Sequence, residues 1–392
     1  MGTLHQVRAA VIGYGGIGSA HTASIALGKV EGMTLAAVCD INPARLDAAA
    51  ERFPGVRCVA DYHALLDGSV DAVIIAVPHP MHCEIAADCL RGGVHVLSEK
   101  PLDVSVTAAQ RAVQAAQETG RIFAVMLNQR TAPIFQRARE IVQSGQLGQL
   151  KRTVWIITNW YRTQHYYDSG AWRATWSGEG GGVLLNQAPH NLDLWQWICG
   201  MPASVSAYCD VARYHRIEVE DDATLMTRYA NGATGLFVTS TGEYPGTNRL
   251  EIAGDRGKLV LEEGVLKWWK LRESEHDVRW HSDSSMPRIP LDYVEERFED
   301  GGAQHRGILQ NFAGAILHGE TLISPAADGL NELALSNAAY LSQWTGNARV
   351  DLPLDGAAFD ALLQEHAAHS MTHEALASIP EGEYQDRWQT RW

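Results

Sequence analysis

Gly13-Tyr14-Gly15-Gly16-Ile17-Gly18 is the stretch that decides the fold of the first part of the chain. It follows a short apolar run at residues 8–12 and opens a helical pattern at residues 16–27. In a Gly-x-Gly-x-x-Gly turn the first glycine allows the tight bend, the second lets the backbone approach a pyrophosphate, and the third lets helix and strand pack closely. The pyrophosphate lies at the helix N-terminus. An ordinary strand–helix turn is the alternative, so the surrounding sequence has to decide.

The surrounding sequence supplies an acidic residue at the end of the next expected strand, residues 34–39. This residue is Asp40, which comes 22 residues after Gly18, near the spacing of about 20 that dinucleotide sites use. A carboxylate there accepts hydrogen bonds from ribose hydroxyls and repels the 2′-phosphate of NADP. The sequence therefore predicts NAD as the cofactor. The expected contacts from this region are Gly13, Tyr14, Gly15, Gly16, Ile17, Gly18 and Asp40.

Strand and helix patterns alternate through the first third of the chain. The expected strands are residues 71–77, 94–98 and 122–127, and the expected helices are residues 43–52, 81–90 and 107–118. Asn42 suits the N-cap of the first of these helices. Such alternation predicts a parallel sheet covered by helices on both faces. We expect a Rossmann domain of the α/β class over residues 1–129.

The pattern changes near residue 130. A helix at residues 133–143 is followed by a strand at 153–158 and by successive strands between residues 203 and 281. The strongest turn signal is Asn231-Gly232, where both residues tolerate the positive φ of a type I′ turn. This predicts an α+β domain over residues 130–392 with a large open, mainly antiparallel sheet. Residues 273–300 are interpreted as a loop, and late helices at 307–318 and 329–345 are expected to pack on the first domain.

Bulk properties exclude several classes of function. The chain has 392 residues and a formal charge of −14, and this size favours two domains. Nucleic-acid binding needs clustered Lys and Arg, so an acidic protein is not expected to use it. No apolar run approaches the ~20 residues of a membrane helix, and the N-terminus lacks signal-peptide regions. None of the six cysteines forms a C-x-x-C pair, so we expect a cytoplasmic protein without a metal site.

Glu99-Lys100-Pro101 follows the expected strand at residues 94–98. The carboxyl ends of such strands face the ligand crevice, so Lys100 is expected in the crevice, with a solvated surface charge as the alternative. A lysine beside the positively charged nicotinamide ring would have its pKa lowered by like charge, which suits proton transfer.

Together with the segment at residues 180–193, GGGVLLNQAPHNLD, these features resemble the Gfo/Idh/MocA family of oxidoreductases over essentially the whole chain. The resemblance implies that Lys100 and His190 handle the proton of a substrate hydroxyl while the cofactor takes the hydride. The family commonly has Asp at the position of Asn186. Asparagine carries no charge, so Asn186 and Gln187 are expected to orient substrate by hydrogen bonds. Asp193, one helical turn further on, is expected to steady the imidazole.

The resemblance also implies cofactor contacts on the nicotinamide side. The family usually has a Thr-Pro-Asn-like turn after the strand at residues 71–77, where this chain has Val77-Pro78-His79. For His82 a structural role is an equal alternative. The expected contacts are Pro78, His79, His82, Glu99, Lys100 and Asn128.

Residues 155–176 combine many aromatic rings with amide and guanidinium donors. Sugars stack their C–H faces on such rings and give their hydroxyls to fixed donors and acceptors. Some of these rings are expected to serve a core or an interface instead. The expected substrate-binding residues are Trp160, Arg162, Tyr166, Trp172 and Arg173, with His305 as a further candidate.

Within the family, the wording of residues 166–176 and 186–193 resembles the branch of levoglucosan dehydrogenase and the glycoside 3-dehydrogenases. This implies NAD-dependent oxidation of the C3 hydroxyl of a pyranose to a keto sugar. The alternatives are an inositol or other polyol dehydrogenase, an NAD-dependent glycosidase without net redox change, and a protein that holds NAD without turnover. Lys100 argues against the glycosidase, whose family members lack it, and Lys100 with His190 argues against the last. A homodimer or homotetramer through the antiparallel sheet is expected.

Overall fold

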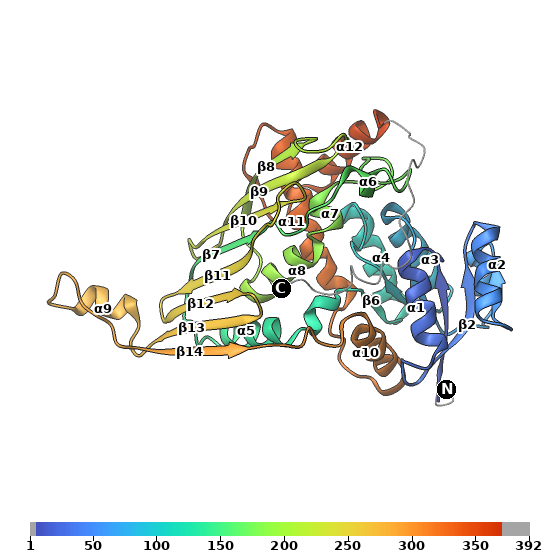
Figure 1. Cartoon of the computed structure of the whole chain (residues 1–392), viewed down its shortest axis with the longest axis horizontal. Coiled ribbons are helices and arrows are strands. Elements are labelled where there is room, and N and C mark those ends of the chain that lie inside the picture. Colours follow the sequence, from blue (N-terminus) through green and yellow to red (C-terminus); the bar gives the residue numbers. More distant parts are fainter. Residues whose placement is uncertain (1–4, 371–392) are drawn as a thin grey trace.

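A computed structural model describes residues 5–370 of the chain. The first domain, which holds the blue N-terminal part of the chain in Figure 1, is a six-stranded parallel sheet in the order β3-β2-β1-β4-β5-β6. Its strands are β1 (Val7–Ile12), β2 (Met33–Cys39), β3 (Arg57–Val59), β4 (Ala72–Ile75), β5 (His95–Ser98) and β6 (Phe123–Val125). Its helices are α1 (Gly16–Ala26), α2 (Pro43–Arg52), α3 (His82–Arg91) and α4 (Val106–Thr119), with short turns η1 (Tyr62–Leu65), η2 (His79–Met81) and η3 (Asn128–Thr131). The predicted Rossmann architecture is confirmed.

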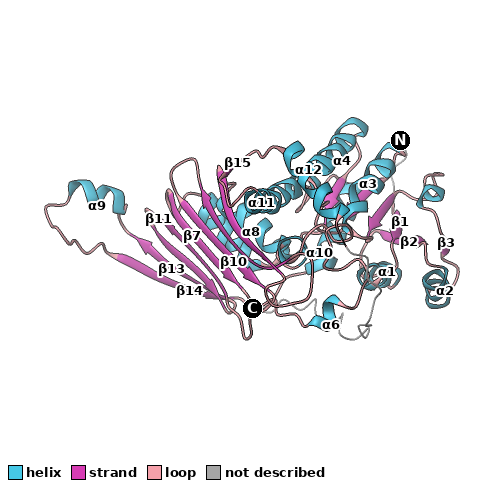
Figure 2. Ribbon diagram, turned by 90° about the horizontal axis from the view of Figure 1, so that it is seen from above, coloured by secondary structure: helices cyan, strands magenta, loops and turns pink. Residues whose placement is uncertain are grey.

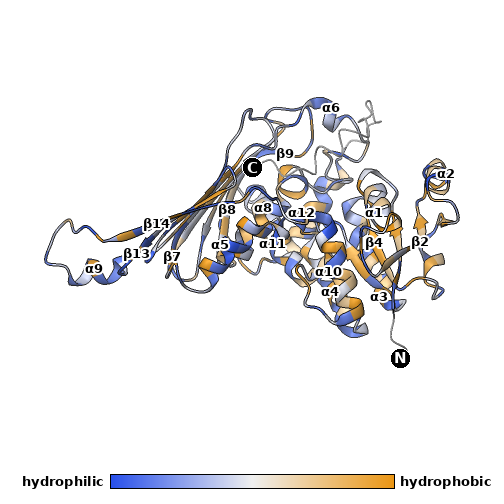
Figure 3. Cartoon of the chain, turned by 60° about the horizontal axis from the view of Figure 1, so that its bottom comes forward, coloured by the Kyte–Doolittle hydropathy of each residue, from blue (hydrophilic) through white to orange (hydrophobic). Residues whose placement is uncertain are grey.

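Side chains of the central strand β1 alternate between two apolar clusters. Val7 and Val11 pack with Phe312 of α10 (Gln304–His318) on one face. Ala10 and Ile12 lie on the other face, in the cluster that contains residues of α3 and α4. In Figure 3, β2 and β4 are strongly apolar, whereas α4 and α10 carry both colours, as expected of helices with one buried face. Both faces of the sheet are therefore covered, which is why its strands show continuous apolar runs.

The second domain is built on a nine-stranded sheet in the order β14-β13-β12-β11-β7-β10-β9-β8-β15. Its strands are β7 (Leu150–Ile157), β8 (Ser204–Val211), β9 (Glu220–Arg228), β10 (Thr234–Ser240), β11 (Asn248–Gly254), β12 (Gly257–Glu262), β13 (Val265–Leu271), β14 (Leu291–Arg297) and β15 (Val350–Asp351). Among the described strands of this sheet, only β7 and β10 pair in parallel. The predicted large, mainly antiparallel sheet is confirmed.

Helices cover one face of this sheet (Figure 2). They are α5 (Pro133–Gln143), α8 (Pro189–Cys199) and α11 (Ala326–Trp344), and the short helices α6 (Gln164–Tyr167), α7 (Val183–Asn186), α9 (Glu275–His281) and α12 (Gly356–Ala368) complete the domain. Trp155 of β7 is fully buried and packs against Phe135 of α5 and Phe237 of β10. Residues 129 and 130, where the sequence analysis divides the domains, lie in η3, and that division stays a prediction.

Two local predictions are wrong. Residues 273–300 are not simply a loop, because they contain α9 and the edge strand β14, which pairs with β13 along its whole length. Most of β14 is exposed, so no apolar pattern marks it. Besides the backbone pairing, Glu296 of β14 pairs with Arg137 and its Tyr293 packs on Trp269. In the turn at Asn231-Gly232 only Gly232 has a positive φ, 87°, so the turn is not type I′. That geometry, with both residues at positive φ, occurs instead at Glu263-Gly264.

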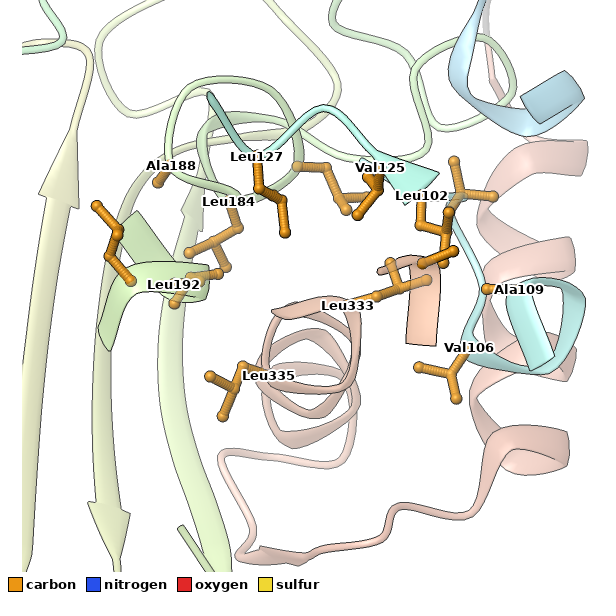
Figure 4. Close-up of a cluster of buried hydrophobic side chains, with 14 of the residues drawn as sticks. Leu102, Val106, Ala109, Val125, Leu127, Leu184, Ala188, Leu192, Leu333 and Leu335 are labelled. Atoms are coloured by element: carbon orange, nitrogen blue, oxygen red, sulfur yellow. The ribbon is translucent and has the colours of Figure 1, made fainter. Parts of the chain in front are cut away.

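Helix α11 lies between the two domains and packs on α4 and β6 on one side and on α8 and β8 on the other. Figure 4 shows the apolar cluster around it, in which Leu333 faces Leu102 and Val106 of the first domain. Leu335 lies on the side of α8 and Leu192. Together with α10, this helix confirms the prediction that the late helices return to the first domain. Within residues 5–370, no helix is long and apolar enough to cross a membrane.

A buried network of ion pairs holds α8 against η3 and α11. The guanidinium of Arg130 in η3 is fully buried and donates to both carboxylate oxygens of Asp193, at 2.8 and 2.6 Å. Its third nitrogen donates to Asp328 of α11 at 2.6 Å. Asp193 therefore faces Arg130, and the expectation that it steadies His190 is wrong.

Replacing this arginine tests how far the network holds the domains together. Arg130→Met would leave the Asp193 carboxylate buried without its counter-charge, and we expect a loss of about 3–5 kcal/mol in the free energy of unfolding. Arg272→Met is the control, because Arg272 pairs with Asp292 at the surface. Urea unfolding of both variants measures the effect. Equal losses for the two would contradict a special role for the buried network.

Candidate active site

A cavity of about 1110 Å³ opens at the carboxyl ends of β1, β2, β4 and β5 and extends to the second domain. Ligands of open α/β sheets bind at this end of the strands. Every site residue predicted from the sequence lines this cavity except Tyr14 and Gly18, which lie beneath the glycine turn. The structure thus brings the two halves of the predicted site together, although their segments are far apart in the chain.

The glycine turn has the geometry that a pyrophosphate needs. Gly13 has a φ of 95°, and a Cβ there would overlap the backbone oxygen of Ala76. A Cβ on Gly18 would overlap the backbone of Gly13, so this glycine permits the close packing of helix and strand. Gly15 faces open space and caps α1 without any side-chain hydrogen bond. The first backbone N–H groups of α1 are therefore available to an anion.

Asp40 is a fixed carboxylate at the adenosine end of the cavity. Its two oxygens accept the backbone N–H groups of Tyr14 at 2.7 Å and Asn42 at 2.8 Å. Arg45 lies 3.3 Å from one of them. Because the carboxylate is held in place and lines the cavity, it fits the ribose hydroxyls of NAD.

Lys100 reaches from the first domain into the second. Its Nζ donates to the backbone oxygen of Asn186, in α7, at 2.7 Å. Burial lowers the pKa of Lys100, and the nearby carboxylates of Glu99, Glu179 and Glu332 oppose this change. The ammonium is therefore placed where a change of protonation is easier than in water.

His190 stands at the N-terminus of α8, directly after Pro189. Burial lowers its pKa well below the ordinary value, and the positive charge of Lys100 adds to this effect. The imidazole is consequently neutral at physiological pH and able to accept a proton. Within residues 5–370, its buried Nδ1 has no hydrogen-bond partner.

Four of the predicted substrate residues meet at one hydroxyl. The Tyr166 hydroxyl lies 3.0 Å from Asn186 Nδ2, 3.1 Å from Gln187 Nε2 and 2.8 Å from Arg173 Nη1. The Tyr166 ring lies between two guanidinium groups, 5.1 Å from that of Arg162 and 4.6 Å from that of Arg173. This arrangement gives the cavity a rigid wall of donors around an aromatic ring.

Another wall of the cavity combines histidines with Trp172. His79 Nδ1 lies 3.0 Å from the backbone oxygen of Glu179, and its ring meets Trp172 edge-on. Both ring nitrogens of His82 lie 2.8 Å from backbone oxygens, those of Val77 and Pro101. His82 therefore supports the loop as well as lining the cavity. Asn128 lines it too and donates to Gln304.

The aromatic residues of the segment divide between two roles. Trp160, Tyr166 and Trp172 line the cavity. Trp176 instead packs edge-on against Tyr340 and Trp344 of α11. Trp155 is likewise core, so the expectation that some of these rings belong to the core is confirmed.

Two family models match the chain. The oxidoreductase family with an NAD-binding Rossmann fold matches residues 7–127, and the GFO/IDH/MocA C-terminal domain matches residues 135–260. The chain belongs to the Gfo/Idh/MocA family. It is an NAD-dependent oxidoreductase of a family whose members include sugar and inositol dehydrogenases.

Three relatives illustrate the range of the family. The scyllo-inositol 2-dehydrogenase (NAD(+)) of Bacillus subtilis is 27% identical over 86% of this chain and 93% of its own length. The levoglucosan dehydrogenase of Pseudarthrobacter phenanthrenivorans is 24% identical over 57% of this chain and 64% of its own. A solved WlbA dehydrogenase from Bordetella pertussis, with NADH and UDP-GlcNAcA, is 28% identical, covers 89% of this chain and 100% of its own, and superposes with a TM-score of 0.73.

Three polar residues of this family member escaped the sequence analysis. One is His21 of α1, whose Nε2 lies 2.7 Å from a carboxylate oxygen of Glu99. Glu99 is buried, but its hydrogen bond with His21 keeps the pKa of the Glu99 carboxyl low, at about 2. Glu99 therefore stays ionised in the cavity wall. The predicted substrate residue His305 lies beside this pair, and burial lowers its pKa to about 4.

Glu220 of β9 is the second such residue, and it holds the glycine-rich segment. Its carboxylate accepts the backbone N–H groups of Gly182 and Leu184, both at 2.9 Å, and the Tyr340 hydroxyl at 2.8 Å. Burial raises its pKa to about 7. The third residue, Glu179, touches Asn186 directly and is described below. No local pattern marks His21 and Glu220, since their partners lie far away in the sequence.

The raised pKa of Glu220 predicts a pH-dependent stability. Because the carboxyl has a pKa of about 7 when folded and 4.5 as its ordinary value, the folded state binds more protons between these values. Its contribution to stability therefore falls as pH rises from 4.5 to 7 and levels off above. Thermal unfolding of wild type and Glu220→Gln across this range should show a difference that changes with pH. Glu243→Gln, at an exposed position, should show a constant difference; the same constant difference for Glu220→Gln would refute the assignment.

Proposed function

We propose that this protein oxidises a pyranose hydroxyl, the C3 hydroxyl of an anhydrosugar such as levoglucosan or of a glucoside, to a keto sugar. The observation that carries the proposal is that the aromatic and guanidinium side chains of residues 160–173 line the same cavity as Lys100 and His190. Aromatic rings with convergent fixed donors suit a sugar, which has both apolar faces and hydroxyls. The match to levoglucosan dehydrogenase supports this choice.

The chain's own residues would then manage the proton. NAD, when bound, supplies the carbon that accepts the hydride. The neutral imidazole of His190 takes the hydroxyl proton, and Lys100 holds the same oxygen by a hydrogen bond. The hydroxyl carbon thus loses a hydride and its oxygen loses a proton, which leaves the ketone. Asn186, Gln187 and Arg173 orient the neighbouring hydroxyls.

An inositol or other polyol dehydrogenase is the second candidate. The inositol dehydrogenase relative matches a longer part of the chain than the levoglucosan enzyme does. An inositol offers a ring of hydroxyls to the same donors, and Lys100 and His190 would act in the same way.

A substrate panel decides between these functions. Purified protein is incubated with NAD or NADP and with levoglucosan, a nitrophenyl glucoside, simple monosaccharides, or myo- or scyllo-inositol, while NADH and released nitrophenol are followed. NADH with levoglucosan or the glucoside supports the proposal, and NADH with inositols alone establishes the second candidate. Nitrophenol without NADH would indicate a glycosidase, and NAD binding without either product a binding protein.

Lys100→Ala tests the proton chemistry. We expect turnover to fall by about 10²–10³-fold, the usual effect of removing a hydrogen-bond donor from a developing oxyanion, because the hydroxyl oxygen loses its cationic partner. NAD affinity, followed by fluorescence titration, should stay within about threefold, since the pyrophosphate and ribose contacts lie elsewhere. Lys29→Ala, at an exposed lysine of the same domain, is the control. Turnover that survives in Lys100→Ala would refute this mechanism.

We also propose that the protein assembles as a homodimer or homotetramer through the open face of the nine-stranded sheet. The helices of the domain lie on the opposite face (Figure 2). Tyr208 of β8 and Met226 of β9 are 59% and 60% exposed on neighbouring strands. Exposed apolar side chains on an uncovered sheet favour burial against a second copy.

A further inference from the structure

Glu179 is a buried carboxylate in the turn that precedes the glycine-rich segment. It is only 1% exposed. One carboxylate oxygen accepts the backbone N–H of Ala174 at 2.6 Å, and the other accepts a hydrogen bond from the side-chain amide of Asn186. Arg173 Nη1 lies 4.0 Å from that second oxygen. The Glu179 carboxylate therefore contacts the side chain of Asn186, the residue whose backbone oxygen accepts the hydrogen bond from Lys100.

The contacts of Asn186 fix which end of its amide faces the cavity. Burial raises the pKa of Glu179, and Arg173, the Ala174 N–H, the Asn186 amide and Lys100 oppose this rise. In its ionised form the carboxylate only accepts hydrogen bonds, so it faces the amide nitrogen and not the amide oxygen. The second N–H of this nitrogen points to the Tyr166 hydroxyl at 3.0 Å. Both donors of the amide are thus used inside the protein, whereas within residues 5–370 Oδ1 makes no hydrogen bond. Since Asn186 lines the cavity, its oxygen is the group left for a substrate.

We infer that Glu179 is a positioning residue that orients the Asn186 amide so that its oxygen accepts a hydrogen bond from a substrate hydroxyl. Asparagine alone can present either a donor or an acceptor. With Glu179 behind it, Asn186 presents an acceptor, the polarity that a carboxylate would present at the same position. This inference rests on the proposed function, because it requires a hydroxylated substrate.

A second observation supports the assignment of polarity. The cations that line this part of the cavity are donors only, namely the guanidinium groups of Arg162 and Arg173 and the ammonium of Lys100. A sugar hydroxyl that donates its proton needs an acceptor among them. The Asn186 oxygen supplies one without adding a further charge to the cavity wall.

Glu179→Gln inverts this arrangement while keeping the shape of the turn. The glutamine oxygen still accepts the Ala174 N–H, but its NH₂ group then faces Asn186. Asn186 must turn its oxygen toward Gln and its nitrogen toward the substrate. We expect kcat/KM to fall about 10- to 100-fold, because a buried donor then meets a donor. The thermal midpoint and the affinity for NAD should stay close to those of wild type.

A paired substitution separates positioning from a structural role. In Glu179→Gln combined with Asn186→Asp, the glutamine NH₂ donates to one aspartate oxygen and the other oxygen faces the cavity as an acceptor. We expect this double variant to recover kcat/KM to within about fivefold of wild type, while Asn186→Asp alone places two carboxylates together and is impaired. An unchanged kcat/KM in Glu179→Gln, a double variant no better than the single, or a parallel loss of stability and NAD affinity would each overturn the inference.

Amide orientation can also be read without any turnover. The Asn186 side-chain NH₂ signal in a ¹H–¹⁵N spectrum is assigned by its loss in Asn186→Asp. Its protons should exchange slowly with water in wild type, because both are hydrogen-bonded inside the protein, and quickly in Glu179→Gln. Fast exchange in wild type overturns the inference. If the substrate panel fails entirely while slow exchange holds, the proposed function is at fault and the amide orientation stands.

Discussion

The hydrogen bond from Lys100 Nζ to the backbone oxygen of Asn186, 2.7 Å long, is the interaction on which the site depends. Lys100 follows β5 of the first domain, and Asn186 ends α7 of the second. Lys100 and Asn186 can contact the same bound cofactor and substrate only if the two domains keep a fixed position relative to each other. The apolar packing of α11 and the Arg130–Asp193 pair keep that position fixed, because both span the boundary.

Burial is the physical cause of most of the site's electrostatics. Taking a charged group out of water is costly unless a partner compensates it. The paired carboxylate of Glu99 therefore remains ionised beside His21, whereas the unpaired imidazole of His190 is held neutral. The site thus holds the ionised carboxylate of Glu99, a lysine whose pKa is lowered, and the neutral imidazole of His190.

The first domain was largely predictable, because its information is local. Glycines at Gly13, Gly15 and Gly18, the apolar strands, and Asp40 at the end of β2 each follow from a short stretch of sequence. The contacts that tune the site are not local: His21 and Glu99 are 78 residues apart, and Glu220 and Gly182 are 38 apart. A buried glutamate within a polar stretch looks like a surface residue until the fold shows its partners. For the same reason β14, whose side chains are mostly exposed, escaped recognition, and Asp193 was assigned the wrong partner.

The proposed function divides the site into elements that perform the chemistry and elements that select the substrate, and this division accounts for relatives on one scaffold that act on inositols and on anhydrosugars. Lys100 and His190 stand at the ends of regular elements, β5 and α8, whose positions are set by the core. Residues 158–182 are mostly irregular and are held at separate points, by Tyr167 on Thr241 and by Trp176 on α11. Between these points the segment contributes Trp160, Tyr166 and Trp172 to the lining of the cavity. Changes between the fixed points can alter the sugar that fits while leaving the proton-handling groups in place, because loops tolerate substitution better than the elements that anchor them.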